Sequence, residues 1–135
     1  MNAETIVNAM MSSDSFSNWL GIEVVRIEAG YCELRMTTRS EMTNGFGILH
    51  GGISYSLADS ALAFAANSFG RHALSIETSI SHHKKVASNE VITAEASPIA
   101  IGEKFSNFSV IIKNAENEVV ASFKGTVYNS SKYWA

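Results

Sequence analysis

The residues best suited to chemistry are one acidic side chain and a histidine–glycine–glycine triplet that precedes it. Asp59 lies in a strongly apolar segment, where an ionised carboxylate is costly unless it is paired, hydrogen-bonded or used. His50, Gly51 and Gly52 stand where that segment begins, and adjacent glycines let a ligand approach the backbone closely. Free amides at a helix N-terminus would stabilise a carbonyl oxygen that becomes negative during acyl transfer. Each feature also has a structural reading: an interface carboxylate for Asp59, and a plain glycine turn for the triplet.

The spacing of these residues decides how they can act together. Asp59 follows Gly51 by eight positions, which is about 12 Å along a helix axis. A carboxylate cannot act across that gap on an atom held at the N-terminus of its own helix. If both residues take part, they come from different subunits, since two such helices packed antiparallel about a two-fold axis would bring them together. An enzyme with this sequence is therefore predicted to be a dimer with shared sites.

Three further groups are candidates for binding. Asn44 lies six residues before His50, where its amide either holds a water or substrate group or forms an Asn-Gly turn. Residues 82–85, His-His-Lys-Lys, are either a solvated loop or a patch for the phosphates of a large anionic ligand, with Lys104 as a further contributor. Adjacent histidines on a strand point to opposite faces, so they make a poor metal pair and no metal site is predicted.

One long helix and six strands must position these residues. Residues 51–68 are apolar nearly all round, which is typical of a buried helix, and residues 3–11 have the spacing of a short one. Six segments have strand-like composition and alternation: 22–27, 31–38, 73–81, 91–100, 105–113 and 119–128. The strands must wrap the long helix because nothing else is large enough to cover it. The tail, 132–135, is expected to be frayed or to dock on a partner chain.

Length and composition exclude several classes of protein. The 135 residues predict one domain, spanning 1–135, and 46% hydrophobic with 17% charged residues is too apolar for a disordered chain. A net charge of −3 gives no broad cationic field for nucleic acid or an anionic membrane. A single cysteine, Cys32, excludes a disulfide framework and a cysteine-based zinc cluster. No membrane-spanning run or signal peptide is visible, so a cytoplasmic location is expected.

The region from Asn44 to Gly70 resembles a known family. The pattern Asn44-Gly-x-x-x-x-His-Gly-Gly, then Ser-Leu-Ala-Asp-Ser-Ala from Ser56 and Asn-Ser-x-Gly from Asn67, is similar to hotdog-fold acyl-CoA thioesterases. Within that family the sequence most resembles the phenylacetate-degradation (PaaI-type) branch, from about Gly21 to Tyr128. The resemblance implies an α+β hotdog fold, in which an antiparallel sheet wraps a long central helix. It also implies a homodimer or homotetramer that hydrolyses an acyl-CoA thioester without a cofactor, since CoA is part of the substrate.

The resemblance also assigns roles. The residue at the position of Asp59 is the general base or the nucleophile, and the amide at the position of Gly51 polarises the thioester carbonyl. His50 supports the loop, and Asn44 helps to hold the carbonyl or the water. A hydroxyl residue in the strand after the helix often assists. Candidates for this last role are Ser75, which is nearer the start of the strand, and Ser79.

The sequence departs from the family in one place. Many relatives have an apolar-Arg-Pro segment where this chain has residues 82–86. Lys84 would replace the arginine as a phosphate contact, but only as a point charge, and Lys85 is a candidate for a further contact. The sequence therefore predicts hydrolysis of a small aryl- or acyl-CoA, with a hydroxyphenylacetyl-CoA-like substrate implied only by the branch. The alternatives are a hotdog dehydratase or hydratase, with His50 and Asp59 as a proton-transferring pair, and a non-catalytic acyl-CoA-binding module.

Overall fold

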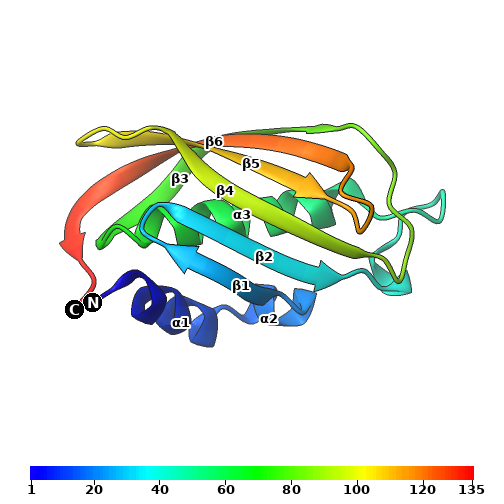
Figure 1. Ribbon diagram of the computed structural model, residues 1–135, viewed down its shortest axis with the longest axis horizontal. Coiled ribbons are helices and arrows are strands. Elements are labelled where there is room, and N and C mark those ends of the chain that lie inside the picture. The colour runs from blue at the N-terminus through cyan, green and yellow to red at the C-terminus, as the bar shows by residue number, and fades with distance from the viewer.

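The long helix α3 (Gly51–Asn67) lies against one face of a six-stranded sheet in the computed structural model, which describes residues 1–135 (Figure 1). Five apolar side chains of this helix are inaccessible to solvent: Leu57, Ala58, Ala61, Leu62 and Ala65. A helix this apolar cannot stay exposed to water, so the sheet curves around it. The prediction of a buried central helix wrapped by strands is confirmed.

The sheet is antiparallel throughout, with the strand order β1-β2-β4-β5-β6-β3. Its strands are β1 (Glu23–Glu28), β2 (Tyr31–Thr37), β3 (Arg71–His82), β4 (Val91–Ala100), β5 (Phe105–Lys113) and β6 (Val119–Tyr133). The strand that follows the helix, β3, pairs only with β6, so its other edge has no partner within the chain. Leu74 and Ile76 on this strand are 70% and 58% exposed. An apolar strand with an open edge is a ready template for pairing with another chain.

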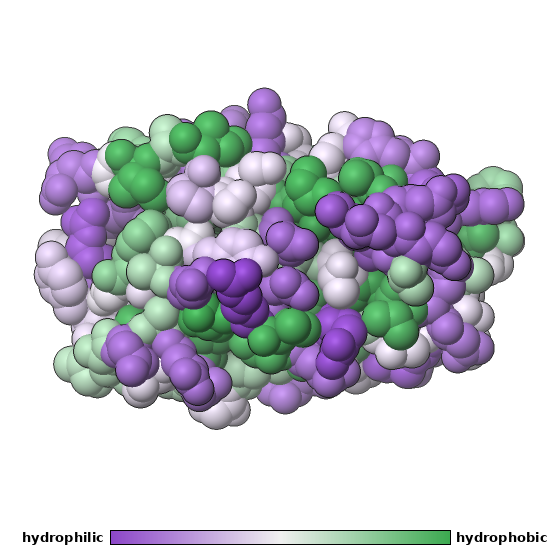
Figure 2. All heavy atoms as spheres, viewed as in Figure 1, coloured by the Kyte–Doolittle hydropathy of each residue, from purple (hydrophilic) through white to green (hydrophobic).

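Alternation along the central strands gives the sheet a buried face and an exposed one. The face toward α3 carries Cys32, Leu34 and Met36 from β2, Ile92, Ala94 and Ala96 from β4, and Phe108, Val110 and Ile112 from β5, all fully buried. Figure 2 views the opposite face, where hydrophobic and hydrophilic side chains are interspersed. The buried Cys32 thiol has its pKa raised to about 12 by desolvation, which leaves it a core residue without nucleophilic character.

Two short helices precede the sheet. The first, α1 (Ala3–Ser13), agrees with the prediction for residues 3–11, but α2 (Ser15–Leu20) was not predicted. Asp14 caps α2 by accepting a hydrogen bond from the Ser17 amide at 2.9 Å, and Gly21 ends it with φ of 75°. A six-residue helix is too short to show a periodic pattern, so only its caps signal it in the sequence. No helix in the structure combines the length and apolarity needed to cross a membrane.

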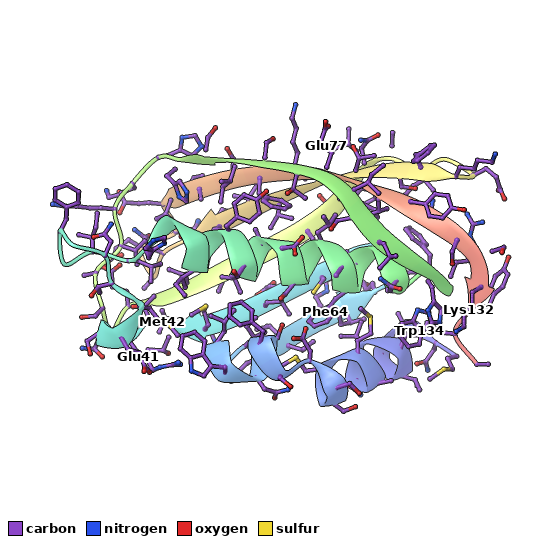
Figure 3. All side chains as sticks on the ribbon, turned by 180° about the vertical axis from the view of Figure 1, so that it is seen from behind. Glu41, Met42, Phe64, Glu77, Lys132 and Trp134 are labelled. Carbon is purple, nitrogen blue, oxygen red and sulfur yellow. The ribbon has the colours of Figure 1, made fainter.

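The C-terminal end differs from the prediction. Strand β6 continues to Tyr133 rather than ending at residue 128, and Trp134 docks on its own chain beside the C-terminal end of α3 (Figure 3). Its indole Nε1 donates to Asn67 Oδ1 at 3.0 Å, and its ring stacks on His72 with centroids 4.2 Å apart. Asn67 also bridges to both backbone groups of Ala73, which fixes the turn from α3 into β3.

Candidate active site

The N-terminus of α3 leaves one backbone donor free. The predicted supporting role of His50 has a clear structural basis, because its Nδ1 accepts the Gly52 amide at 2.8 Å and caps the helix. The backbone of His50 is held as well, since its own amide donates to Met42 and its carbonyl accepts from Ile53, both at 2.9 Å. The Gly51 amide donates to no group of the chain. This amide therefore remains available to a ligand at the positive end of the helix dipole.

The loop before the helix is held in shape by Asn44. Its Oδ1 accepts the amides of Phe46 and Ile48 at 2.9 and 3.4 Å, and its backbone amide donates to the Ile48 carbonyl at 2.8 Å. The turn interpretation of Asn44 is thus confirmed. Its Nδ2 makes no bond within the chain, and the residue lines the same pocket as Gly51. Asn44 can therefore shape the loop and still offer a donor to a bound group.

A pocket of about 330 Å³ opens at this end of α3. Four of the residues predicted to form the site line this pocket: Asn44, Gly51, Lys84 and Lys85. His82, the last residue of β3, lies directly against Gly51: its Nε2 is 3.0 Å from the position that a Cβ on Gly51 would occupy. An added Cβ at this point would push the ring aside by a few tenths of an ångström, so glycine lets the ring and a ligand approach the helix end most closely.

Asp59 lies elsewhere on the same helix. Its carboxylate is about half buried, makes no hydrogen bond or ion pair within the chain, and does not line the pocket at Gly51. Desolvation raises its pKa above the usual value for an aspartate. Asp59 follows Tyr55 by one turn and shares its helix face. A partly buried carboxylate without a partner is poised to accept a proton.

The hydroxyl candidates on β3 are separated by a bulge. The strand pairs Ser75 with Val127 and Glu77 with Thr126 of β6, so one extra residue lies between them and the alternation changes phase. Ser75, opposite buried Val127, is on the face toward α3, whereas Ser79 is on the face turned away from it, together with Glu77 (Figure 3). Within one chain the structure therefore does not bring Ser79 together with Asp59 or Gly51.

Sequence reasoning missed a third hydroxyl in this strand. Thr78 faces α3 after the bulge, and its Oγ1 is hydrogen-bonded to the Tyr55 hydroxyl, one helical turn before Asp59. Its methyl group packs near Gly125, where an added Cβ would meet Thr78 and Leu62. A register shift of one residue is invisible in the sequence pattern, so strict alternation would place Thr78 on the outer face.

The three predicted phosphate contacts are not equivalent. Lys84 and Lys85 line the pocket, but the Nζ of Lys84 lies 2.6 Å from Glu118 Oε2, and this contact raises the pKa of Lys84. Lys85 makes no ion pair within the chain. Lys104 is at the opposite end of α3: its carbonyl accepts from Asn129, which pairs with Ala73 just beyond the helix C-terminus. Within one chain Lys104 therefore does not belong to the basic cluster.

Comparisons with known proteins identify the family. Residues 46–121 match the model of the family described as "Thioesterase superfamily". A putative esterase of Archaeoglobus fulgidus is 36% identical over 93% of this chain and 81% of its own length. The acyl-coenzyme A thioesterase PaaI of Escherichia coli is 31% identical over 87% of this chain and 84% of its own.

The solved structure of E. coli PaaI superimposes on this one with a TM-score of 0.95, covering 97% of this chain and 95% of that protein at 29% identity. The predicted hotdog fold and the resemblance to the PaaI-type branch are thereby confirmed. The chain belongs to the thioesterase superfamily, and its reaction is the hydrolysis of a thioester.

Proposed function

We propose that this protein hydrolyses small aryl- or acyl-CoA thioesters, with Asp59 as general base or nucleophile and the Gly51 amide as oxyanion donor. The observation that carries the proposal is the Asp59 carboxylate, which is half buried and without a partner in the chain. As general base, it takes a proton from the water that attacks the carbonyl carbon. The C–S bond then breaks, its electron pair leaves with the CoA sulfur, and the thiolate takes up a proton. The reaction needs no cofactor.

The site is shared between two subunits in this proposal. Asp59 and Gly51 of one chain lie about 12 Å apart along α3, which is too far for both to act on the same carbonyl. The open edge of β3, with Leu74 and Ile76 exposed, offers a surface on which a second copy can continue the sheet. Pairing of two β3 edges about a two-fold axis would lay the two α3 helices side by side and antiparallel. The smallest active unit is then a dimer, of which two form the proposed tetramer.

Release of free thiol from a panel of acyl-CoAs tests the reaction. The panel contains phenylacetyl-CoA, hydroxyphenylacetyl-CoA, straight-chain acyl-CoAs and an enoyl-CoA. The phenylacetyl compounds are included because the relative PaaI of E. coli is described as an acyl-coenzyme A thioesterase and as a protein from the phenylacetic acid degradation operon. We expect stoichiometric release of CoA and carboxylic acid from one or more members. Conversion of an enoyl-CoA to its hydroxyacyl-CoA without thiol release would instead identify a hydratase. Saturable binding without turnover would identify a binding module.

Mixing two inactive variants tests the shared site. Each site takes Asp59 from one chain and Gly51 from the other. A dimer of one Asp59→Asn chain and one Gly51→Pro chain therefore has one site with both residues altered and one site with both intact. Random exchange makes half of the dimers mixed, and we therefore expect recovery of about a quarter of the wild-type activity. Each variant exchanged with itself is the control. An active monomer, or a mixture no more active than its components, would contradict the arrangement.

The basic stretch is proposed to contact the phosphates of CoA. Such a contact binds ground state and transition state alike, so its loss raises KM with little change in kcat. We expect Lys85→Ala to raise KM for acyl-CoA by roughly three- to a hundredfold at low salt. The effect of Lys84→Ala is expected to be smaller, because Glu118 already neutralises that side chain.

Two controls accompany this measurement. A short thioester without the nucleotide should be hydrolysed equally by wild type and variants, and Lys124→Ala, which removes a lysine from the outer face of the sheet, should leave KM unchanged. A KM for acyl-CoA that is insensitive to both substitutions at low salt would show that residues 82–85 are only a solvated loop. We further propose a cytoplasmic location, because the reducing cytosol keeps a free cysteine such as Cys32 in the thiol form and acyl-CoA is available there.

A further inference from the structure

One imidazole beside the Gly51 amide has no role in the function described so far. His82 ends β3, and its ring is packed against Gly51, with Nε2 3.0 Å and Cε1 3.3 Å from the position of an added Cβ. Neither ring nitrogen forms a hydrogen bond within the chain, and the residue is exposed to the pocket that Gly51 also lines. A free imidazole next to a free backbone amide makes two donors that open into one space.

The register of β3 fixes which of the two adjacent histidines has this position. After the bulge, Thr78, Ile80 and His82 face α3, and His82 pairs with buried Ala121. His83 points the other way, and its Nε2 is bonded to Ser122 Oγ at 2.7 Å on the outer face of the sheet. His83 also borders the pocket, but its ring is turned away from the Gly51 amide, so of the two histidines only His82 lies against that amide.

We propose that His82 donates a hydrogen bond from Nε2 to the thioester carbonyl oxygen, as the second donor of an oxyanion hole whose first donor is the Gly51 amide. This proposal rests on the proposed function. As water adds to the carbonyl carbon, the electron pair of the C=O bond moves to the oxygen, which then carries a negative charge between two fixed donors. The neutral imidazole with its proton on Nε2 suffices, and His82 exchanges no proton with the substrate.

The geometry also accounts for the glycine. A side chain at position 51 would force the imidazole to shift, because the added Cβ would lie at 3.0–3.3 Å from two ring atoms. With glycine, the ring can lie beside the helix end while its Nε2 remains accessible. His50 does not take this role within the chain, because it lines a different hollow, with Phe16 and Thr43.

Three variants test the proposal through steady-state kinetics. His82→Phe keeps a planar ring but removes the donor, and we expect kcat to fall on the order of 10²-fold with KM within about threefold of wild type. His82→Gln retains an N–H donor and should recover most of that loss. Lys124→Ala, on the outer face of the sheet, should match wild type. A His82→Phe variant within about threefold of the wild-type kcat, or equal losses in the Phe and Gln variants, would overturn the proposal.

Binding of unreactive analogues separates donation to the carbonyl from packing. A CoA ketone, in which a methylene replaces the sulfur, keeps the carbonyl oxygen, whereas a CoA thioether lacks it. We expect His82→Phe to weaken binding of the ketone and to leave the thioether unaffected, and equal weakening of both would show a packing role instead. If wild type itself released no thiol from any acyl-CoA, the proposed function would fail. Normal wild-type turnover with an unaffected His82→Phe variant would remove only the role of His82.

Discussion

Asp59→Asn is expected to lower kcat for acyl-CoA by about 10²–10⁴-fold or more, with KM little changed. The amide has the size of the carboxylate but cannot accept a proton from water or attack the thioester carbonyl. Free-thiol release under saturating substrate measures the effect. Glu116→Gln, which removes one negative charge from the exposed turn between β5 and β6, should retain full activity. A loss of less than about threefold in Asp59→Asn would remove Asp59 from the mechanism.

The same variant has a predicted stability signature that separates loss of function from loss of fold. Burial raises the pKa of Asp59 in the folded protein, so folding favours the protonated form. The stability that this provides is complete below the unfolded-state pKa and is lost as the pH rises through the folded-state pKa. At neutral pH the ionised Asp59 carboxylate therefore lowers the stability of the folded protein. Asp59→Asn should have a higher Tm than wild type at pH 7, and the difference should disappear in acid.

Gly51→Pro is expected to lower kcat by about 10²–10³-fold, the usual effect of removing one oxyanion-hole donor. Proline deletes the Gly51 N–H, yet it is well tolerated at the first position of a helix, where that group has no acceptor. His50 already has φ −63° and ψ 135°, the extended conformation that a residue before proline adopts. The substitution therefore removes a hydrogen-bond donor with little disturbance of α3, which circular dichroism can verify.

Gly51→Ala is the matched control for the proline variant. Both substitutions add a Cβ that meets the exposed His82 ring at 3.0 Å, but alanine keeps the N–H. If the amide is the important group, the alanine variant should be much more active than the proline variant. Equal activities would show that crowding by the Cβ, rather than hydrogen bonding, governs turnover at this position.

Much of the fold could be predicted from the sequence because its periodic signals are strong. The apolar stretch of α3 and the alternation in β2, β4 and β5 belong to elements buried on one side or all round, where hydrophobic patterning is most informative. The separation of Asp59 from Gly51 followed from helix geometry alone, because both residues lie on one regular element. The free Gly51 amide likewise follows from its place in the first turn.

The features of the site that could not be predicted depend on a strand bulge and on long-range contacts, neither of which produces a periodic pattern in the sequence. The bulge between Ser75 and Glu77 reverses which side chains of β3 face the helix, and so brings Thr78 and His82 to the inner face. The distance of Lys104 from Lys84 depends on how far β4 and β5 extend before they turn. The ion pair of Lys84 with Glu118 joins segments more than thirty residues apart, which no local pattern reveals.

The position of β3 at the sheet edge has a consequence for synthesis of the chain. Because β3 pairs only with β6, the strand that follows α3 emerges from the ribosome long before its partner, with β4 and β5 made in between. Until β6 arrives, both edges of β3 are open, and residues around Leu74 and Ile76 have nothing to pair with. Chains that stop short of β6 are therefore expected to aggregate rather than to fold as smaller active enzymes, since this pairing is non-local and forms late.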